Sequence, residues 1–225
     1  MSILISLLLV GAAVISQRAL VRPPATTTMV QTQAADSTTS AASVALKSLT
    51  IKGRAPKTAY SRAQFGAGWT TTGGCDTRNV ILRRDLTGIS PDKGCIVISG
   101  SLADPYTGRT IRFLRGASTS SDVQIDHVVA LSNAWQTGAQ QLSQDRRIEL
   151  ANDSLELLAV DGPTNIQKSD GDAATWLPPN KAYRCQYVAR QIAVKLKYQL
   201  WLTAAESETM ATTLQTCPSQ TLPKA

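Results

Sequence analysis

Residues 123–131 have the sequence VQIDHVVAL and contain His127, the only histidine among the 225 residues. The apolar and β-branched residues around Asp126 and His127 predict a strand that holds both side chains rigidly. One imidazole cannot supply a multi-histidine metal site, but it can act as a general base because its ordinary pKa lies nearest neutrality. The adjacent carboxylate can bind a hard cation through oxygen. Taken alone, the stretch fits a half-buried histidine without chemistry better, so the sequence downstream has to decide.

Residues 152–168, NDSLELLAVDGPTNIQK, supply that context. The apolar run 155–160 predicts a second strand, and Asp161-Gly162-Pro163 predicts a turn. A helix should begin near Thr164 or Asn165, with Asp161 or Thr164 as its cap. Asn165 and Lys168 are three residues apart and would therefore share one face of that helix.

The remaining elements surround this region. Residues 95–99 and 110–114 predict two strands, and the turn signal Asp104-Pro105-Tyr106-Thr107-Gly108 between them makes a hairpin. Val80-Ile81-Leu82 predicts a further short strand. Helices are predicted over 132–150 with a break at Gly138, over 181–203, and over 204–214.

The four cysteines show no Cys-x-x-Cys spacing, and one histidine is too few to complete a structural zinc site. Two disulfides formed in an oxidising compartment account for them better. Three connectivities exist. We favour Cys75–Cys95 and Cys185–Cys217, because each closes a local loop and would contribute about 3–4 kcal/mol in the chain-entropy model.

The N-terminal sequence favours export. Ile3–Ile15 is a short apolar run of about signal-peptide length. Arg18 and Arg22 follow this run, which makes an uncleaved membrane anchor the alternative to a secreted protein. We expect a signal peptide or anchor over 1–22, a disordered Thr/Ser/Ala-rich linker over 23–48, the folded domain over 49–218 and a tail over 219–225.

The formal net charge of +7 favours polyanionic partners such as nucleic acid. A generic basic exported protein has the same charge, so the charge is consistent with a nucleic-acid substrate without requiring one.

The order of the elements is a strand with Asp126-His127, then Asn152, a second strand, and a helix with Asn-x-x-Lys. This order resembles the ββα-metal site of HNH endonucleases. Residues 60–218 are similar to secreted actinobacterial HNH nucleases and to the C-terminal HNH domain of GmrSD-type modification-dependent restriction enzymes. The stretches that carry the resemblance are Tyr60-Ser61-Arg62, Phe65-Gly66, Trp69, Cys75-Asp76-Thr77-Arg78, Asp104 to Gly108, Ile125 to Val129, Ala151-Asn152-Asp153, Asn165 to Lys168 and Asp170-Gly171-Asp172.

The resemblance implies an α+β fold with a ββα-metal (HNH, His-Me finger) core, an N-terminal β-hairpin region, C-terminal helices and two disulfides. It also implies an exported, monomeric, metal-dependent endonuclease that cleaves DNA, or alternatively RNA, with little sequence specificity. Phosphodiester hydrolysis needs an activated water, a cation at the phosphate and stabilisation of the leaving oxygen.

By this resemblance His127 is the general base, and Asn152 fixes its ring. Asp126 and Asn165 hold a divalent cation, most simply Mg²⁺, with Mn²⁺ or Ca²⁺ as alternatives.

Two basic residues, Lys168 and Arg78, are candidates for binding phosphate. A solvated lysine and an ordinary surface arginine are the alternatives. On the same fold, a non-catalytic basic module that binds nucleic acid is the competing function, and a toxin delivered to rival cells is the competing biology.

Overall fold

The stretch around His127 forms β6 (Val123–His127) in the computed structural model, which describes residues 41–91 and 94–223. This strand pairs antiparallel with β7 (Leu157–Asp161), and α5 (Gly162–Lys168) follows β7 directly. Both predicted strands and the predicted helix are therefore confirmed. Asp161 is the helix cap, because its carboxylate accepts a hydrogen bond from the backbone N–H of Thr164 at 2.8 Å.

The β6–β7 pair is buried on both of its faces. Leu158 and Val160 belong to a core formed mainly by helices, whereas Leu157 and Ala159 belong to a second core. This two-sided burial explains why the sequence of β7 is continuously apolar. Side chains alternate along a strand, so Asp126 and His127 point to opposite faces.

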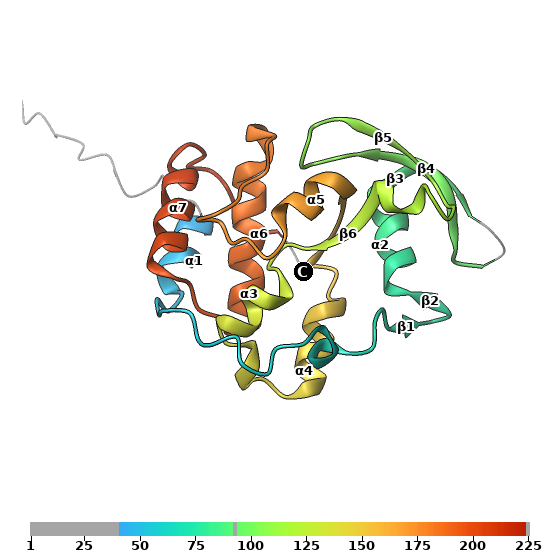
Figure 1. Ribbon diagram of the computed structural model, residues 1–225. Helices are drawn as coiled ribbons and strands as arrows, with labels where there is room; N and C mark the ends of the chain where they lie inside the picture. The colour runs from blue at the N-terminus through green and yellow to red at the C-terminus, as the bar shows by residue number, and fades with distance from the viewer. Residues whose placement is uncertain (1–40, 92–93, 224–225) are drawn as a thin grey trace, which may run out of the picture. The chain divides into compact units, whose positions relative to one another are not determined.

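The second core is formed by β6–β7, the helix over Thr77–Asp85 and a three-stranded antiparallel sheet of order β3-β4-β5, whose strands are labelled in Figure 1. The turn at 104–108 connects β4 and β5, as predicted. A separate pair of two-residue strands, β1 and β2, precedes α2 (Thr77–Asp85). The remaining strands are β1 (Thr71–Thr72), β2 (Cys75–Asp76), β3 (Leu86–Pro91), β4 (Val97–Ala103) and β5 (Thr110–Leu114).

The strand predicted at Val80-Ile81-Leu82 is wrong, because these residues lie in α2 (Thr77–Asp85). The Asp76 carboxylate accepts a hydrogen bond from the backbone N–H of Asn79 at 2.7 Å and so caps the helix. Thr77 and Ile81, four residues apart, are both buried. A three-residue apolar run cannot distinguish a buried helix from a strand, whereas the cap at Asp76 does.

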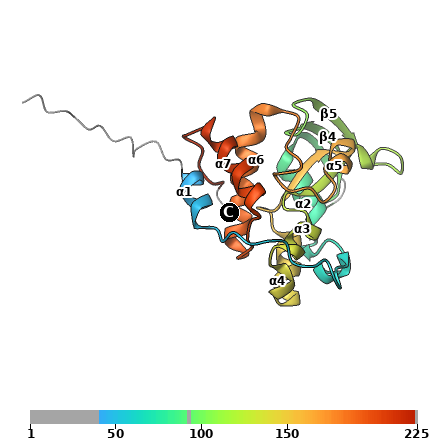
Figure 2. The same ribbon diagram turned by 60° about the vertical axis from the view of Figure 1, so that its left-hand side comes forward.

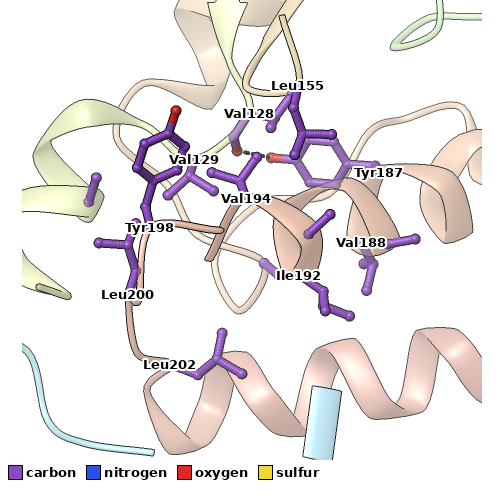
Figure 3. Close-up of a cluster of buried hydrophobic side chains, with 14 of the residues drawn as sticks. Val128, Val129, Leu155, Tyr187, Val188, Ile192, Val194, Tyr198, Leu200 and Leu202 are labelled. Atoms are coloured by element: carbon purple, nitrogen blue, oxygen red, sulfur yellow. Dashed lines mark hydrogen bonds between the residues drawn. The ribbon is translucent and has the colours of Figure 1, made fainter. Parts of the chain in front are cut away.

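The helical core gathers around α6 (Arg184–Lys197), as Figures 1 and 2 show. Figure 3 shows Val188, Ile192 and Val194 among the apolar side chains of this core. One of its buried polar contacts is made by the Tyr187 hydroxyl, which donates to the carbonyl of Val128 at 3.3 Å (Figure 3). The other helices are α1 (Ala41–Ser48), α3 (Leu131–Gln136), α4 (Gln144–Asn152) and α7 (Ala204–Gln215), with short 3₁₀ helices at η1 (Arg62–Phe65), η2 (Ser120–Asp122), η3 (Ala139–Gln141) and η4 (Lys181–Tyr183).

The long C-terminal helix predicted over 181–203 is shorter, because α6 ends at Lys197 and the chain turns at Gln199 with φ 54°. The turn directs Leu200 and Leu202 into the core. Cys185 and Cys217 form a disulfide that joins α6 to the end of α7, and Cys75 and Cys95 form the other. The favoured pairing is confirmed.

Residues 41–48, which composition assigns to the linker, form α1. This helix packs against α6 and α7 and buries Ala42 and Leu46 (Figure 2). The packed domain therefore begins by residue 41. The predicted signal peptide and residues 23–40 of the predicted linker lie outside the described residues. None of the helices within residues 41–91 and 94–223 combines the length and the apolar character that crossing a bilayer requires.

Candidate active site

His127 lies at the end of β6 with its ring largely buried, at 6% relative exposure. Its Nε2 atom is 3.0 Å from the carbonyl oxygen of Ala151. A carbonyl oxygen can only accept, so Nε2 carries the hydrogen and Nδ1 keeps the free electron pair. The indole of Trp69 lies parallel to the imidazole, with ring centroids 5.7 Å apart. The backbone of α4 thus sets the tautomer that a general base requires.

The surroundings of His127 keep its imidazole neutral. Burial, together with the positive charge of Arg62, lowers the pKa from its ordinary 6.5 to about 3. The hydrogen bond to Ala151 acts in the opposite direction. Neutral imidazole is the form that can take a proton, and His127 is in this form throughout the physiological range, although the lowered pKa also weakens its affinity for the proton.

Asp126, on the opposite face of β6, is held in a buried polar cluster. Its Oδ2 accepts a hydrogen bond from the Tyr106 hydroxyl at 2.5 Å, and its Oδ1 lies 3.0 Å from Lys168 Nζ. Burial raises the pKa of Asp126, while the charge of Lys168 lowers it. The Asp126 carboxylate is therefore already paired with a positive charge, the ammonium group of Lys168.

Lys168 does not occupy the position expected of a phosphate ligand. Its side chain is fully buried, and its ammonium group also donates to the carbonyl of His127 at 2.9 Å. The helix face shared by Asn165 and Lys168 places the lysine beneath β6, where it stabilises Asp126. A phosphate outside the protein cannot reach it without exposing that pair.

Asn165, in α5, borders the same pocket as Asp126 and His127, a cavity of about 220 Å³. Its Nδ2 donates to Gln124 Oε1 at 2.9 Å, so the amide carbonyl oxygen is left to accept other partners. Gly162 makes the position of α5 attainable, because a Cβ at that residue would lie 2.0 Å from the carbonyl oxygen of Ser121. The close approach brings Asn165 beside β6.

The structure corrects the role expected of Asn152, which is not bonded to His127. Asn152 Oδ1 accepts hydrogen bonds from the backbone N–H of Thr70 and from the Thr77 hydroxyl, both at 2.9 Å. Its Nδ2 donates to the carbonyl of Ile148. Asn152 ends α4 and therefore points toward the segment that carries Trp69, while the preceding carbonyl holds the histidine.

Arg78 is likewise engaged inside the protein. Its Nη2 donates to the carbonyls of Ser120 and Val123 at 3.1 and 3.0 Å, and burial lowers its pKa. These bonds anchor the start of β6, so Arg78 contributes to the scaffold of the site and has less capacity to bind phosphate.

Arg62 is the charged residue of the site that residue-level sequence reasoning did not single out. It lies in η1, is exposed, and has no ion pair or hydrogen bond among the described residues. It borders the pocket of His127 and Asn165 and also a second pocket beside Trp69. The signal available in the sequence was its place in Tyr60-Ser61-Arg62, one of the stretches that carry the family resemblance.

The donor set of the first pocket is of the chemical type that binds a hard divalent cation, but both carboxylate oxygens of Asp126 are already bonded, to Tyr106 and to Lys168. A carboxylate and an amide oxygen, from Asp126 and Asn165, are ligands of the kind that Mg²⁺ and Ca²⁺ prefer. Within the described residues no three His, Cys, Asp or Glu side chains gather at one point. A cation here would thus depend on these two oxygens together with water or substrate phosphate, and Lys168 would weaken its attraction to Asp126.

Comparison with known proteins identifies the family of this chain. The family model of the C-terminal domain of GmrSD restriction endonucleases matches residues 76–213, more than half of the chain. The chain belongs to this family. It is also 40% identical over 174 residues to an uncharacterized secreted protein of Arthroderma benhamiae, which covers 76% of this chain and 82% of that protein. No solved structure matches the chain.

Proposed function

We propose that the protein is a metal-dependent endonuclease that hydrolyses phosphodiester bonds of DNA, or of RNA, with little sequence specificity. In this proposal β6, β7 and α5 are the ββα-metal core. The observation that carries it is the single pocket bordered by His127, Asp126, Asn165 and the unpaired Arg62. Family membership supports a nuclease, and the net charge of +7 suits a polyanionic substrate.

His127 is the general base in this mechanism. Its Nδ1 takes a proton from the attacking water, while Ala151 holds the Nε2–H and so keeps the ring oriented. Arg62 binds the phosphate that enters the pocket, because its guanidinium is exposed and has no partner within residues 41–91 and 94–223. Asp126 and Asn165 would hold the cation, which when bound neutralises phosphate charge and stabilises the leaving oxygen.

A plasmid-nicking assay of the purified, oxidised protein tests the proposal. Cleavage should occur with Mg²⁺ or Mn²⁺ and stop with EDTA. His127→Ala should abolish cleavage, and Asn165→Ala should raise the metal concentration required. Leu114→Ala, an exposed apolar residue on β5, is the control and should cleave normally. Failure of the wild type to cut DNA or RNA with any common divalent cation would refute the proposal.

A non-catalytic module that binds nucleic acid is the second candidate. The buried pair of Lys168 with Asp126 favours it, because that carboxylate is already neutralised before any cation arrives. Salt-sensitive DNA binding that survives His127→Ala, combined with no cleavage by the wild type, would identify this alternative.

We further propose that the protein is exported and acts as a monomer. The two disulfides and the secreted relative support export. Sequencing the N-terminus of the protein recovered from culture medium distinguishes a cleaved signal peptide from an anchor, and light scattering determines the oligomeric state.

A further inference from the structure

A second pocket, of about 340 Å³, also borders His127 and is lined mainly by apolar groups that include Phe65 and Trp69. It shares Arg62 with the first pocket. We infer that this pocket binds an unpaired nucleobase of the nucleotide next to the scissile phosphate, with Trp69 as its stacking platform. The inference rests on the proposed nuclease function and specifies its substrate class as single-stranded nucleic acid.

The chemistry of the pocket suits a base better than it suits a duplex. Trp69 is only partly buried, and its indole borders the cavity beside the imidazole of His127. Aromatic side chains stack on unpaired bases with little regard to sequence, whereas a base inside a duplex is already stacked and must first be extruded. Arg62 lies between the two pockets, where the phosphate that follows the base would enter the reaction site.

The segment that carries Trp69 is held on both sides, so the platform exists before a ligand binds. After Trp69, the Thr70 N–H donates to Asn152 Oδ1, and the Thr70 carbonyl accepts from the Thr77 N–H at 2.9 Å. Before it, Arg147 donates to the carbonyl of Gln64 at 2.9 Å. Preorganisation of this kind reduces the entropy lost on binding.

Small residues keep the pocket open between these two anchors. Gly66 has φ +100° and Gly68 has φ +144°, values that residues with side chains rarely adopt. A Cβ at Gly66 would approach Ile148 to 3.3 Å, whereas a Cβ at Gly68 would enter open space. The loop thus places one large side chain, Trp69, beside His127 and leaves the space next to it free.

Binding in EDTA tests the inference without cleavage. Fluorescence anisotropy is measured with a labelled single-stranded DNA oligonucleotide, the same sequence as a duplex, and an RNA oligonucleotide. Trp69→Ala should weaken binding of the single strand by about 5- to 150-fold, because stacking is worth about 1–3 kcal/mol per base. Trp69→Phe should retain most of the affinity, and the control Leu114→Ala should retain all of it. The RNA and DNA arms show which sugar the site accepts.

An abasic oligonucleotide provides the same test from the ligand side and needs no protein variant. A single-stranded oligonucleotide with one base, centred on the preferred cleavage position and otherwise abasic, should bind the wild type as the full sequence does. Removal of that base should lower the affinity of the wild type by the same factor as the Trp69→Ala substitution does. In the Trp69→Ala variant, removal of the base should lower the affinity no further. Duplex bound as tightly as single strand, or equal loss of both in Trp69→Ala, would overturn the base pocket.

The two proposals fail in different ways. Cleavage that is lost in His127→Ala but unchanged by Trp69→Ala and by the abasic substitution would refute the base pocket and support the nuclease proposal. Absence of cleavage with every divalent cation would remove the nuclease itself, whatever the binding measurements show.

Discussion

Replacing Lys168 by Met should lower the free energy of unfolding more than replacing any exposed lysine by Met does. Lys168 is fully buried, with Nζ 3.0 Å from Asp126 Oδ1 and 2.9 Å from the carbonyl of His127. Methionine fills similar volume but removes the cationic partner of a buried carboxylate, which keeps hydrogen bonds from the Tyr106 hydroxyl and the backbone of His127. Breaking a buried ion pair in this way costs about 3–5 kcal/mol, a large part of the total stability of a typical domain.

Urea unfolding at pH 7, followed by circular dichroism, measures this cost. Lys57→Met is the matched control, because Lys57 forms an exposed pair with Asp170 whose loss should cost less than about 1 kcal/mol. Adding Asp126→Asn to Lys168→Met removes the unpaired charge and should restore much of the stability. A loss below about 1 kcal/mol for Lys168→Met alone would refute the structural role and return this lysine to the phosphate-binding candidates.

The same variant has a defined pH dependence. Burial already raises the pKa of Asp126, and removal of Lys168 takes away the charge that opposes this shift. When a carboxyl group has a raised pKa in the folded state, the protein loses stability as the pH rises above the pKa of that group in the unfolded chain, about 3.8. The deficit of Lys168→Met relative to the wild type should therefore be small near pH 4 and grow toward pH 7.

Three further predictions use the same assays. The low pKa of His127, about 3 against an ordinary 6.5, means that its contribution to stability is complete above pH 6.5 and lost as pH falls toward 3. From pH 7 to pH 5 the wild type should therefore lose about 2 kcal/mol more than His127→Gln, and parallel curves would contradict the buried neutral ring. Asn152→Ala removes the bonds accepted from Thr70 and Thr77 and should cost about 2 kcal/mol in thermal unfolding, while Asn152→Asp keeps the oxygen that accepts both bonds and should lose less. Reduction opens loops of 20 and 32 residues and should cost about 3–4 kcal/mol each; a melting temperature indifferent to reductant would exclude this.

Local sequence was sufficient for the two strands and the helix around His127. The apolar alternation of β6, the turn at Asp161 and the start of α5 are properties of a few consecutive residues, so their order could be predicted. Disulfide pairing could also be predicted, because each favoured bridge closes a short loop. A three-residue apolar run was too short to assign correctly, and the strand predicted at 80–82 is a helix.

Only the tertiary structure decided which side chains border the pocket and which are buried in support of it. Trp69 and Arg62 lie about sixty residues before His127, and no local pattern shows that they border its ring. The sequence placed Asn165 and Lys168 on one helix face, but the packing of α5 against β6 buries the lysine on Asp126 and leaves the amide in the pocket. Periodicity specifies which face of an element is shared; the neighbour that this face meets depends on contacts between distant parts of the chain, and those contacts determine burial, charge pairing and pKa.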